Sequence, residues 1–142
     1  MTYNDLQKAN KTIKTTDIKG KAYAEVNQRI NAFRMLYPEG TIKTEILSLN
    51  EGVCVIRATV GYYYGGEFIV LGTGIAYEKE GSTFINKTSY IENCETSAVG
   101  RALAMVGIGI NTSVASFEEV SNAIINQERE SGPPKAYTRQ NG

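Results

Sequence analysis

Histidine and tryptophan are absent from this 142-residue sequence, and only two cysteines are present. The missing histidine removes the commonest general base and the commonest metal ligand together. Cys54 and Cys94 each lie inside a periodic apolar segment, which is typical of reduced core thiols and not of a disulfide framework. No apolar run approaches the ~20 residues that span a bilayer, and the polar N-terminus has no export signal. We therefore expect a soluble, cytoplasmic protein without a membrane partner.

Net charge is also lacking, since 15 basic residues balance 15 acidic ones. A nucleic-acid-binding domain is usually basic, so this balance counts against such a function. The charges are unevenly distributed, however. Residues 1–45 hold eight basic and five acidic side chains, while residues 90–130 hold two basic and six acidic ones. This asymmetry is compatible with a basic stripe on a neutral protein.

The order of the patterns predicts one domain over residues 21–128, between a flexible basic arm (1–20) and a flexible tail (129–142). Apolar residues at three- and four-residue steps from Lys21 predict an N-terminal helix that ends at the Tyr-Pro-Glu-Gly segment, 37–40. Runs rich in β-branched and aromatic residues, separated by turn signals, follow it. They predict strands at 41–49, 53–64 and 67–77, and a short fourth strand at 83–85.

Two capping boxes mark the helices of the second half. Ser89 with Glu92 opens a long helix near 90–106, and Ser116 with Glu119 opens a last helix near 117–128. Gly107 is well placed to end the long helix. The predicted fold is α+β: an antiparallel three- to four-strand meander with a long helix packed on one face (a β-β-β-α core) and an N-terminal helix.

Catalytic patterns are missing. Without histidine there is no Ser/His or Cys/His pair, and the two cysteines lie forty residues apart without a second thiol pair. The stretches Gly72-Thr-Gly74 and Gly107-Ile-Gly109 do not have the spacing of a phosphate loop, and close backbone packing or a helix stop explains them. We expect no catalysis, no cofactor and no metal.

Binding is better supported than catalysis. Tyr62, Tyr63 and Tyr64 lie at a hairpin tip marked by Gly65-Gly66, with Phe68 opposite, where they could stack on bases or pack in a subunit contact. Arg101 lies at the border of the apolar stripe of the long helix. A guanidinium there could meet a phosphate with two hydrogen bonds, or it could be an ordinary arginine whose stem covers apolar surface.

Two runs resemble a known family. Cys94-Glu-Thr-Ser-Ala-Val-Gly-Arg-Ala-Leu-Ala-Met-Val-Gly107 looks like the helix of the single-strand annealing recombinases, which include the phage Erf, Sak and Red-beta proteins and the eukaryotic Rad-fifty-two mediator. Arg29-Ile-Asn-Ala-Phe-Arg-Met-Leu-Tyr-Pro-Glu-Gly40 resembles the helix that precedes the family's first strand. The resemblance covers roughly residues 22–110. Gly100 and Ser97 depart from it, because the family has lysine and aspartate there.

This resemblance implies a phage-type protein that binds and anneals single-stranded DNA in homologous recombination, as a homo-oligomeric ring without nucleotide hydrolysis. It would meet other recombination or replication proteins in the host cytoplasm. Arg101 would contact the DNA backbone, and the remaining expected binding residues are Lys87, Arg57, Lys43, Arg29 and Tyr63. Two alternatives stay open: an accessory or inhibitor protein that binds another protein through the same fold, and an enzyme on a helix-and-sheet scaffold.

Overall fold

The computed structural model describes residues 1–82 and 86–131, and it confirms the predicted α+β architecture. The elements follow one another as α1 (Tyr3–Lys11), β1 (Thr15–Ile18), β2 (Lys21–Ala24), α2 (Val26–Leu36), β3 (Thr41–Asn50), β4 (Val53–Tyr64), β5 (Glu67–Lys79), α3 (Asn86–Val106) and α4 (Phe117–Ser131). The predicted fourth strand at 83–85 and the part of the predicted tail after residue 131 lie outside the described residues. Within those residues, no helix combines the length and the apolar character needed to cross a membrane.

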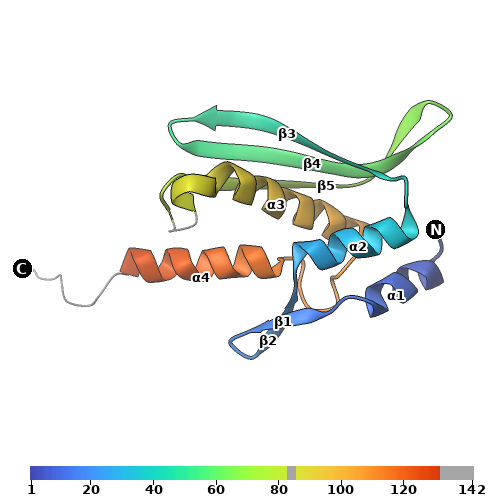
Figure 1. Cartoon of the computed structure of the whole chain (residues 1–142), viewed down its shortest axis with the longest axis horizontal. Helices are drawn as coiled ribbons and strands as arrows, with labels where there is room; N and C mark the ends of the chain where they lie inside the picture. Colours follow the sequence, from blue (N-terminus) through green and yellow to red (C-terminus); the bar gives the residue numbers. More distant parts are fainter. Residues whose placement is uncertain (83–85, 132–142) are drawn as a thin grey trace, which may run out of the picture.

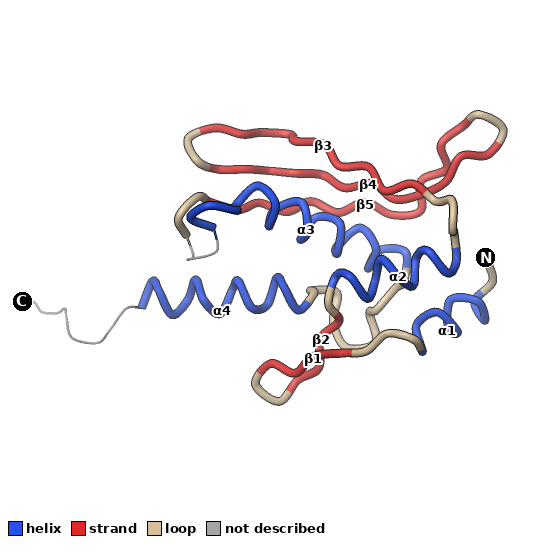
Figure 2. Tube along the Cα trace, viewed as in Figure 1, coloured by secondary structure: helices blue, strands red, loops and turns tan. Residues whose placement is uncertain are grey.

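Three strands form one antiparallel sheet in the order β3-β4-β5, and β1 pairs with β2 in a separate hairpin. The turn between β4 and β5 is made by Gly65 and Gly66, whose φ angles of 59° and 84° favour glycine. The helices lie on one side of the larger sheet, with α3 directly against it, and no element of the described residues covers the other side (Figures 1 and 2). The protein therefore has a two-layer core and one exposed sheet face.

Small residues set the distance between α3 and the sheet. A Cβ atom on Gly72 would lie 2.5 Å from the carbonyl oxygen of Ala102, so the helix backbone approaches the strand too closely for any side chain there. Gly74 meets the backbone of α3 in the same way. The sequence interpretation of Gly72-Thr-Gly74 as a site of close packing is thus confirmed, and Ala98 and Ala102 are completely buried at this contact.

The first twenty residues are not an arm, which corrects the sequence prediction. They form α1, β1 and the turn after β1. Asn10 ties α1 to the end of α3: its side-chain amide donates to the carbonyl of Gly107 at 3.0 Å and its oxygen accepts from the Gly109 N–H at 2.9 Å. The predicted helix also begins later than Lys21, because residues 21–24 pair with β1 and α2 starts at Val26.

The start of α2 is capped from a distant part of the chain. Glu25, the residue before the helix, makes no side-chain capping bond. The carboxylate of Glu118, at the start of α4, accepts the Val26 N–H at 3.1 and 3.3 Å instead. A negative charge at a helix N-terminus is stabilising, so Glu118 stabilises the start of α2. Because Glu118 belongs to α4, the same contact joins the two helices.

The second half matches the predicted helices with small shifts. The long helix α3 begins at Asn86 and is kinked at Ser89, whose φ and ψ of −135° and 28° are not helical. At α4, the Glu119 N–H donates to the Ser116 hydroxyl at 3.2 Å, which is the first half of the predicted capping box. The cysteines are free and buried as predicted, and burial together with the neighbouring Cys54 raises the pKa of Cys94 to about 12.

Candidate nucleic-acid interface

The uncovered side of the sheet brings together three of the predicted binding residues, Lys43, Arg57 and Tyr63. Side chains alternate along a strand, so one set from each strand faces away from α3. We call this surface the open face. Its members are Lys43, Glu45, Val53, Val55, Arg57, Thr59, Tyr63, Phe68, Val70, Thr73, Ile75, Tyr77 and Lys79.

Lys43, Tyr63 and Phe68 form a cluster at the hairpin end of the open face. The rings of Tyr63 and Phe68 lie 5.1 Å apart between centroids and are tilted by 48°. The Lys43 ammonium lies over both rings, 4.2 Å from the centroid of Phe68 and 5.0 Å from that of Tyr63. Cation–π attraction favours this position. The cluster places a positive charge directly beside an exposed aromatic surface.

Arg57 lies in the middle strand of the same face. Its guanidinium pairs with Glu45 across the strands at 2.7 Å, and both side chains are exposed. Exposed pairs of this kind contribute little to stability, so Arg57 can exchange its partner for another anion. A shallow hollow of about 460 Å³ lies beside it, between Lys43, Arg57 and Thr73.

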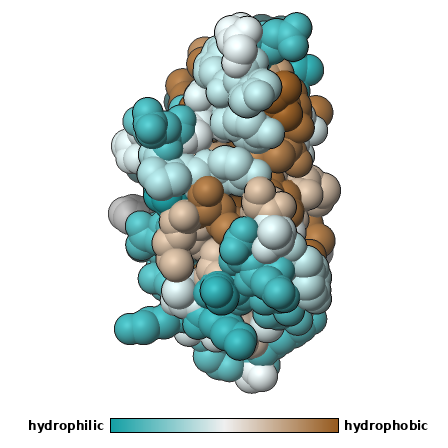
Figure 3. All heavy atoms as spheres, turned by 90° about the vertical axis from the view of Figure 1, so that its right-hand side faces the viewer, coloured by the Kyte–Doolittle hydropathy of each residue, from teal (hydrophilic) through white to brown (hydrophobic). Residues whose placement is uncertain are grey.

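Apolar side chains occupy the rest of the open face. Val70, Ile75 and Tyr77 are each more than half exposed. Seen from the end with the β4–β5 turn, hydrophobic atoms gather in the upper half, where the sheet lies, and the lower end is mainly hydrophilic (Figure 3). The open face thus combines cations, aromatic rings and exposed aliphatic groups.

Arg101 does not share this surface. It lies on α3, on the covered side of the sheet, and its guanidinium pairs with Glu119 of α4 at 3.2 Å. Glu95, which also lies on α3, accepts the Thr44 hydroxyl at 2.6 Å and does not pair with Arg101. The structure thus places Arg101 apart from Lys43 and Arg57, which the sequence analysis named with it as expected binding residues.

The two remaining predicted residues are separated from the open face as well. Lys87 is exposed in the first turn of α3. Arg29 is completely buried, and its guanidinium donates to the carbonyls of Gly100, Val114, Gly109 and Ser113 at 2.9 to 3.2 Å. Its prediction as a nucleic-acid contact is wrong for this fold, because no part of the side chain reaches the surface.

The sequence places Phe68 opposite the tyrosines as a possible stacking partner, but Phe68 is not among the expected binding residues. Tyr63 and Phe68 are direct partners in the hairpin register, and the turn position in the sequence is the signal that pairs them. Glu119 was recognised only as a capping residue. No local signal links it to Arg101, which is 18 residues away.

The order α2-β3-β4-β5-α3, with both helices on one side of the sheet, defines a small α-β-β-β-α domain. The family described as Slr1353 N-terminal dsRNA-binding domain-like matches residues 30–106, more than half of the chain. The chain belongs to this family. Its description likens the domain to those that bind double-stranded RNA. The comparison with curated proteins found no match.

This family assignment overturns the resemblance to the single-strand annealing recombinases. The helix that suggested the resemblance is rich in glycine and alanine for a structural reason. Ala98 and Ala102 face the close contact with β5, and a Cβ on Gly100 would lie 2.8 Å from a methyl group of Val26. Tight packing of a helix between a sheet and a second helix selects the same small residues in unrelated families.

Proposed function

We propose that this protein binds single-stranded nucleic acid across the open face, without a catalytic step. The observation that supports this most is the Lys43–Tyr63–Phe68 cluster on an uncovered sheet. Aromatic rings that accept stacked bases, next to cations that meet phosphates, are the recurring elements of single-strand binding. The family's likeness to RNA-binding domains supports a nucleic-acid partner in general.

The neutral charge of the chain favours a single strand over a duplex as the partner. Duplex binding depends mainly on phosphate contacts by many cations. Stacking adds roughly 1–3 kcal/mol per base without requiring charge. Tyr63, which is 54% exposed, offers a ring for stacking, and Lys43 and Arg57 offer two phosphate contacts.

Fluorescence anisotropy with labelled single strands of about 16 nucleotides, in DNA and RNA form, tests the proposal. Tyr63→Ala should weaken single-strand binding about tenfold or more, since it removes a stacking platform. The double variant Lys43→Ala/Arg57→Ala should flatten the log–log salt dependence by roughly 1.4, for two lost contacts to a single strand.

Matched controls lie on the opposite side of the molecule. Tyr3→Ala removes another exposed tyrosine, and Lys14→Ala/Lys19→Ala removes two exposed lysines near the β1–β2 hairpin. Both should bind like the parent. Binding that is tighter for a duplex of equal length and unaffected by Tyr63→Ala would disprove the proposal.

Self-association is a second candidate function for part of this surface. Val70, Ile75 and Tyr77 leave an exposed apolar group on the open face, and exposed groups of this kind often mark protein contacts. Light scattering on the 15.6-kDa chain should then give a mass above that of the monomer, and Ile75→Lys should reduce it. A monomer at micromolar concentration, with and without oligonucleotide, would exclude this function.

A further inference from the structure

The outer edge of β3 has no strand beside it, because β3 pairs only with β4 among the described strands. In an antiparallel strand, alternate residues direct their N–H and C=O groups away from the paired neighbour. The side chains of residues 43–50 are all exposed, and Ile46 and Leu49 are about half exposed, at 52% and 49%. An open strand edge with exposed apolar side chains favours pairing with another strand.

Two hollows lie beneath this edge, on the side of the sheet that carries the helices. The first, of about 480 Å³, lies between Ile42 of β3 and Ile30 of α2. The second, of about 390 Å³, lies between Ile46 of β3 and Ile91 of α3. Thr44 borders both hollows. They exist because α3 packs mainly on β4 and β5, so a strand beside β3 has room for apolar side chains on this side.

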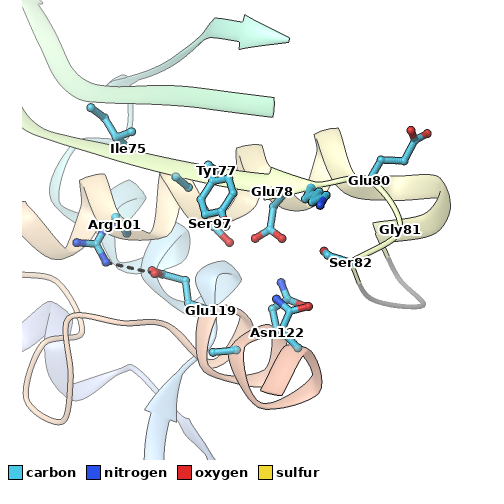
Figure 4. A pocket seen from close by; sticks show the side chains of 14 residues that line it. Ile75, Tyr77, Glu78, Glu80, Gly81, Ser82, Ser97, Arg101, Glu119 and Asn122 are labelled. Carbon is cyan, nitrogen blue, oxygen red and sulfur yellow. Dashed lines mark hydrogen bonds and ion pairs between the residues drawn. The ribbon is translucent and has the colours of Figure 1, made fainter. Parts of the chain in front are cut away.

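The edge of β5, at the other end of the sheet, is less suited to pairing. Leu71 has no partner in β4, so a bulge interrupts β5 near its middle. A cavity of about 870 Å³ follows this edge, and the side chains around it are mainly polar, with Glu78 pointing into it and Glu119 toward Arg101 (Figure 4). In β3 the bulge lies at Leu47, and the residues before it stay regular.

The sequence of β3 is complementary to itself when two copies run antiparallel with Thr44 opposite Thr44. On the open face, Lys43 of each copy then lies opposite Glu45 of the other. On the helix side, Ile42 of each copy lies opposite Ile46 of the other, at the two hollows. Opposite charges and apolar pairs across antiparallel strands both stabilise the pairing. This match identifies a second copy as the partner that the edge fits.

We propose that two copies of this chain associate through β3 into a two-fold symmetric dimer, which joins their sheets into one. The same patch is used on both copies, so the contact closes after two chains. Glu45 then lies between Lys43 of the second copy and Arg57 of its own, with which it pairs at 2.7 Å. One group opposes association: the carboxylate of Glu95, which accepts the Thr44 hydroxyl at 2.6 Å, comes near its counterpart across the axis.

Sedimentation equilibrium of the full chain between about 1 µM and 1 mM tests the assembly. The mass should rise from 15.6 kDa to twice that value. Ile75→Lys alters the open face and leaves β3 unchanged, so it should form the same dimer and nothing larger. The dimer goes beyond the proposed single-strand binding and uses a different surface. A chain that stays monomeric throughout, or loss of the dimer in Ile75→Lys, would overturn the proposal.

Charge variants test the register. Lys43→Glu sets glutamates opposite each other and Glu45→Lys sets lysines opposite each other, so each should weaken self-association at least about tenfold. An equimolar mixture of these two variants should dimerise like the parent, because every pair then has opposite charges. Glu95→Gln should tighten the dimer, and Lys79→Glu, an exposed position outside β3, is the matched control. A mixture that stays monomeric would contradict the register. Circular dichroism verifies that each variant is folded.

Thr44→Cys tests the position of the axis. The new thiol faces its counterpart, and a disulfide needs Cα atoms within about 7 Å, so mild oxidation should link two copies. Leu49→Cys is the matched control, because residue 49 lies outside the paired segment and far from its counterpart. Cys54 and Cys94 are buried and do not compete. Equal cross-linking of both variants, or none of Thr44→Cys, would disprove the two-fold axis at this residue.

Discussion

Replacement of Arg29 by alanine should destabilise the protein strongly without touching the binding surfaces. The buried guanidinium joins α2 to α3 and to the loop before α4 through four carbonyls, those of Gly100, Gly109, Ser113 and Val114. A buried acceptor that loses its donor costs about 1–3 kcal/mol. Burial lowers the pKa of Arg29, so the native protein already bears a cost for its charge, which the substitution removes. Water that enters the space left by the side chain can donate to the four carbonyls and so offsets part of the cost of the lost hydrogen bonds.

These opposing effects lead us to expect a loss of about 4 kcal/mol in the free energy of unfolding, as for a buried charge network that loses one partner. With a urea slope of about 1–3 kcal/mol per molar, the midpoint should fall by roughly 2 M. Arg29→Lys should recover only part of this loss, because an ammonium cannot reach all four carbonyls in the plane of a guanidinium. Urea unfolding followed by circular dichroism measures each variant.

Arg34→Ala is the matched control on the same helix, because Arg34 is exposed. Its midpoint should stay close to that of the parent. The reasoning fails if Arg29→Ala unfolds at the parent's urea concentration. It fails equally if that variant is stable but loses oligonucleotide affinity, since Arg29 would then act at a binding surface.

Three further predictions test buried and half-buried positions. Gly74→Ala should cost about 3 kcal/mol or more in thermal unfolding, because a Cβ there collides with the backbone of α3; an unchanged melting temperature would contradict the close contact. The raised pKa of Glu78 means that its ionised form destabilises the native state at neutral pH, and this cost disappears as the pH falls below the ordinary value of 4.5. Glu78→Gln should therefore raise the melting temperature at pH 7 but not at pH 3.5, and a gain that is equal at both would refute the assignment. Cys94, with its pKa at about 12, should react with a thiol reagent at pH 8 only after unfolding; rapid labelling of the native protein, with Cys54→Ser as the control, would contradict its burial.

Local patterns determined the sheet and the order of its elements. The Gly65-Gly66 turn joins two strands whose side chains alternate, and the structure has strands within two residues of each predicted boundary. Ser116 likewise marked the start of α4, because its hydroxyl bonds to an amide only three residues away. Such signals are readable because the interacting groups are neighbours along the chain. The cluster of Tyr63 with Phe68 follows from the same hairpin register.

Contacts between distant segments decided the rest. Residues 1–20 look like a polar arm in isolation, but they pack on the rest of the domain through Ala9 in the core and through Asn10, which bonds to the backbone of Gly107 and Gly109 about a hundred residues later. From the sequence alone, Arg29 is predicted to be a surface cation, but in the fold the loop before α4 surrounds it with carbonyls. Arg101 is predicted to contact a phosphate, but α4 places Glu119 beside it. Whether an arginine is a binding residue or a structural one depends on which acceptors the fold places around it. A guanidinium makes the same hydrogen bonds to a phosphate as to a carboxylate or a carbonyl, so the sequence identified the donors and only the tertiary structure selected their partners.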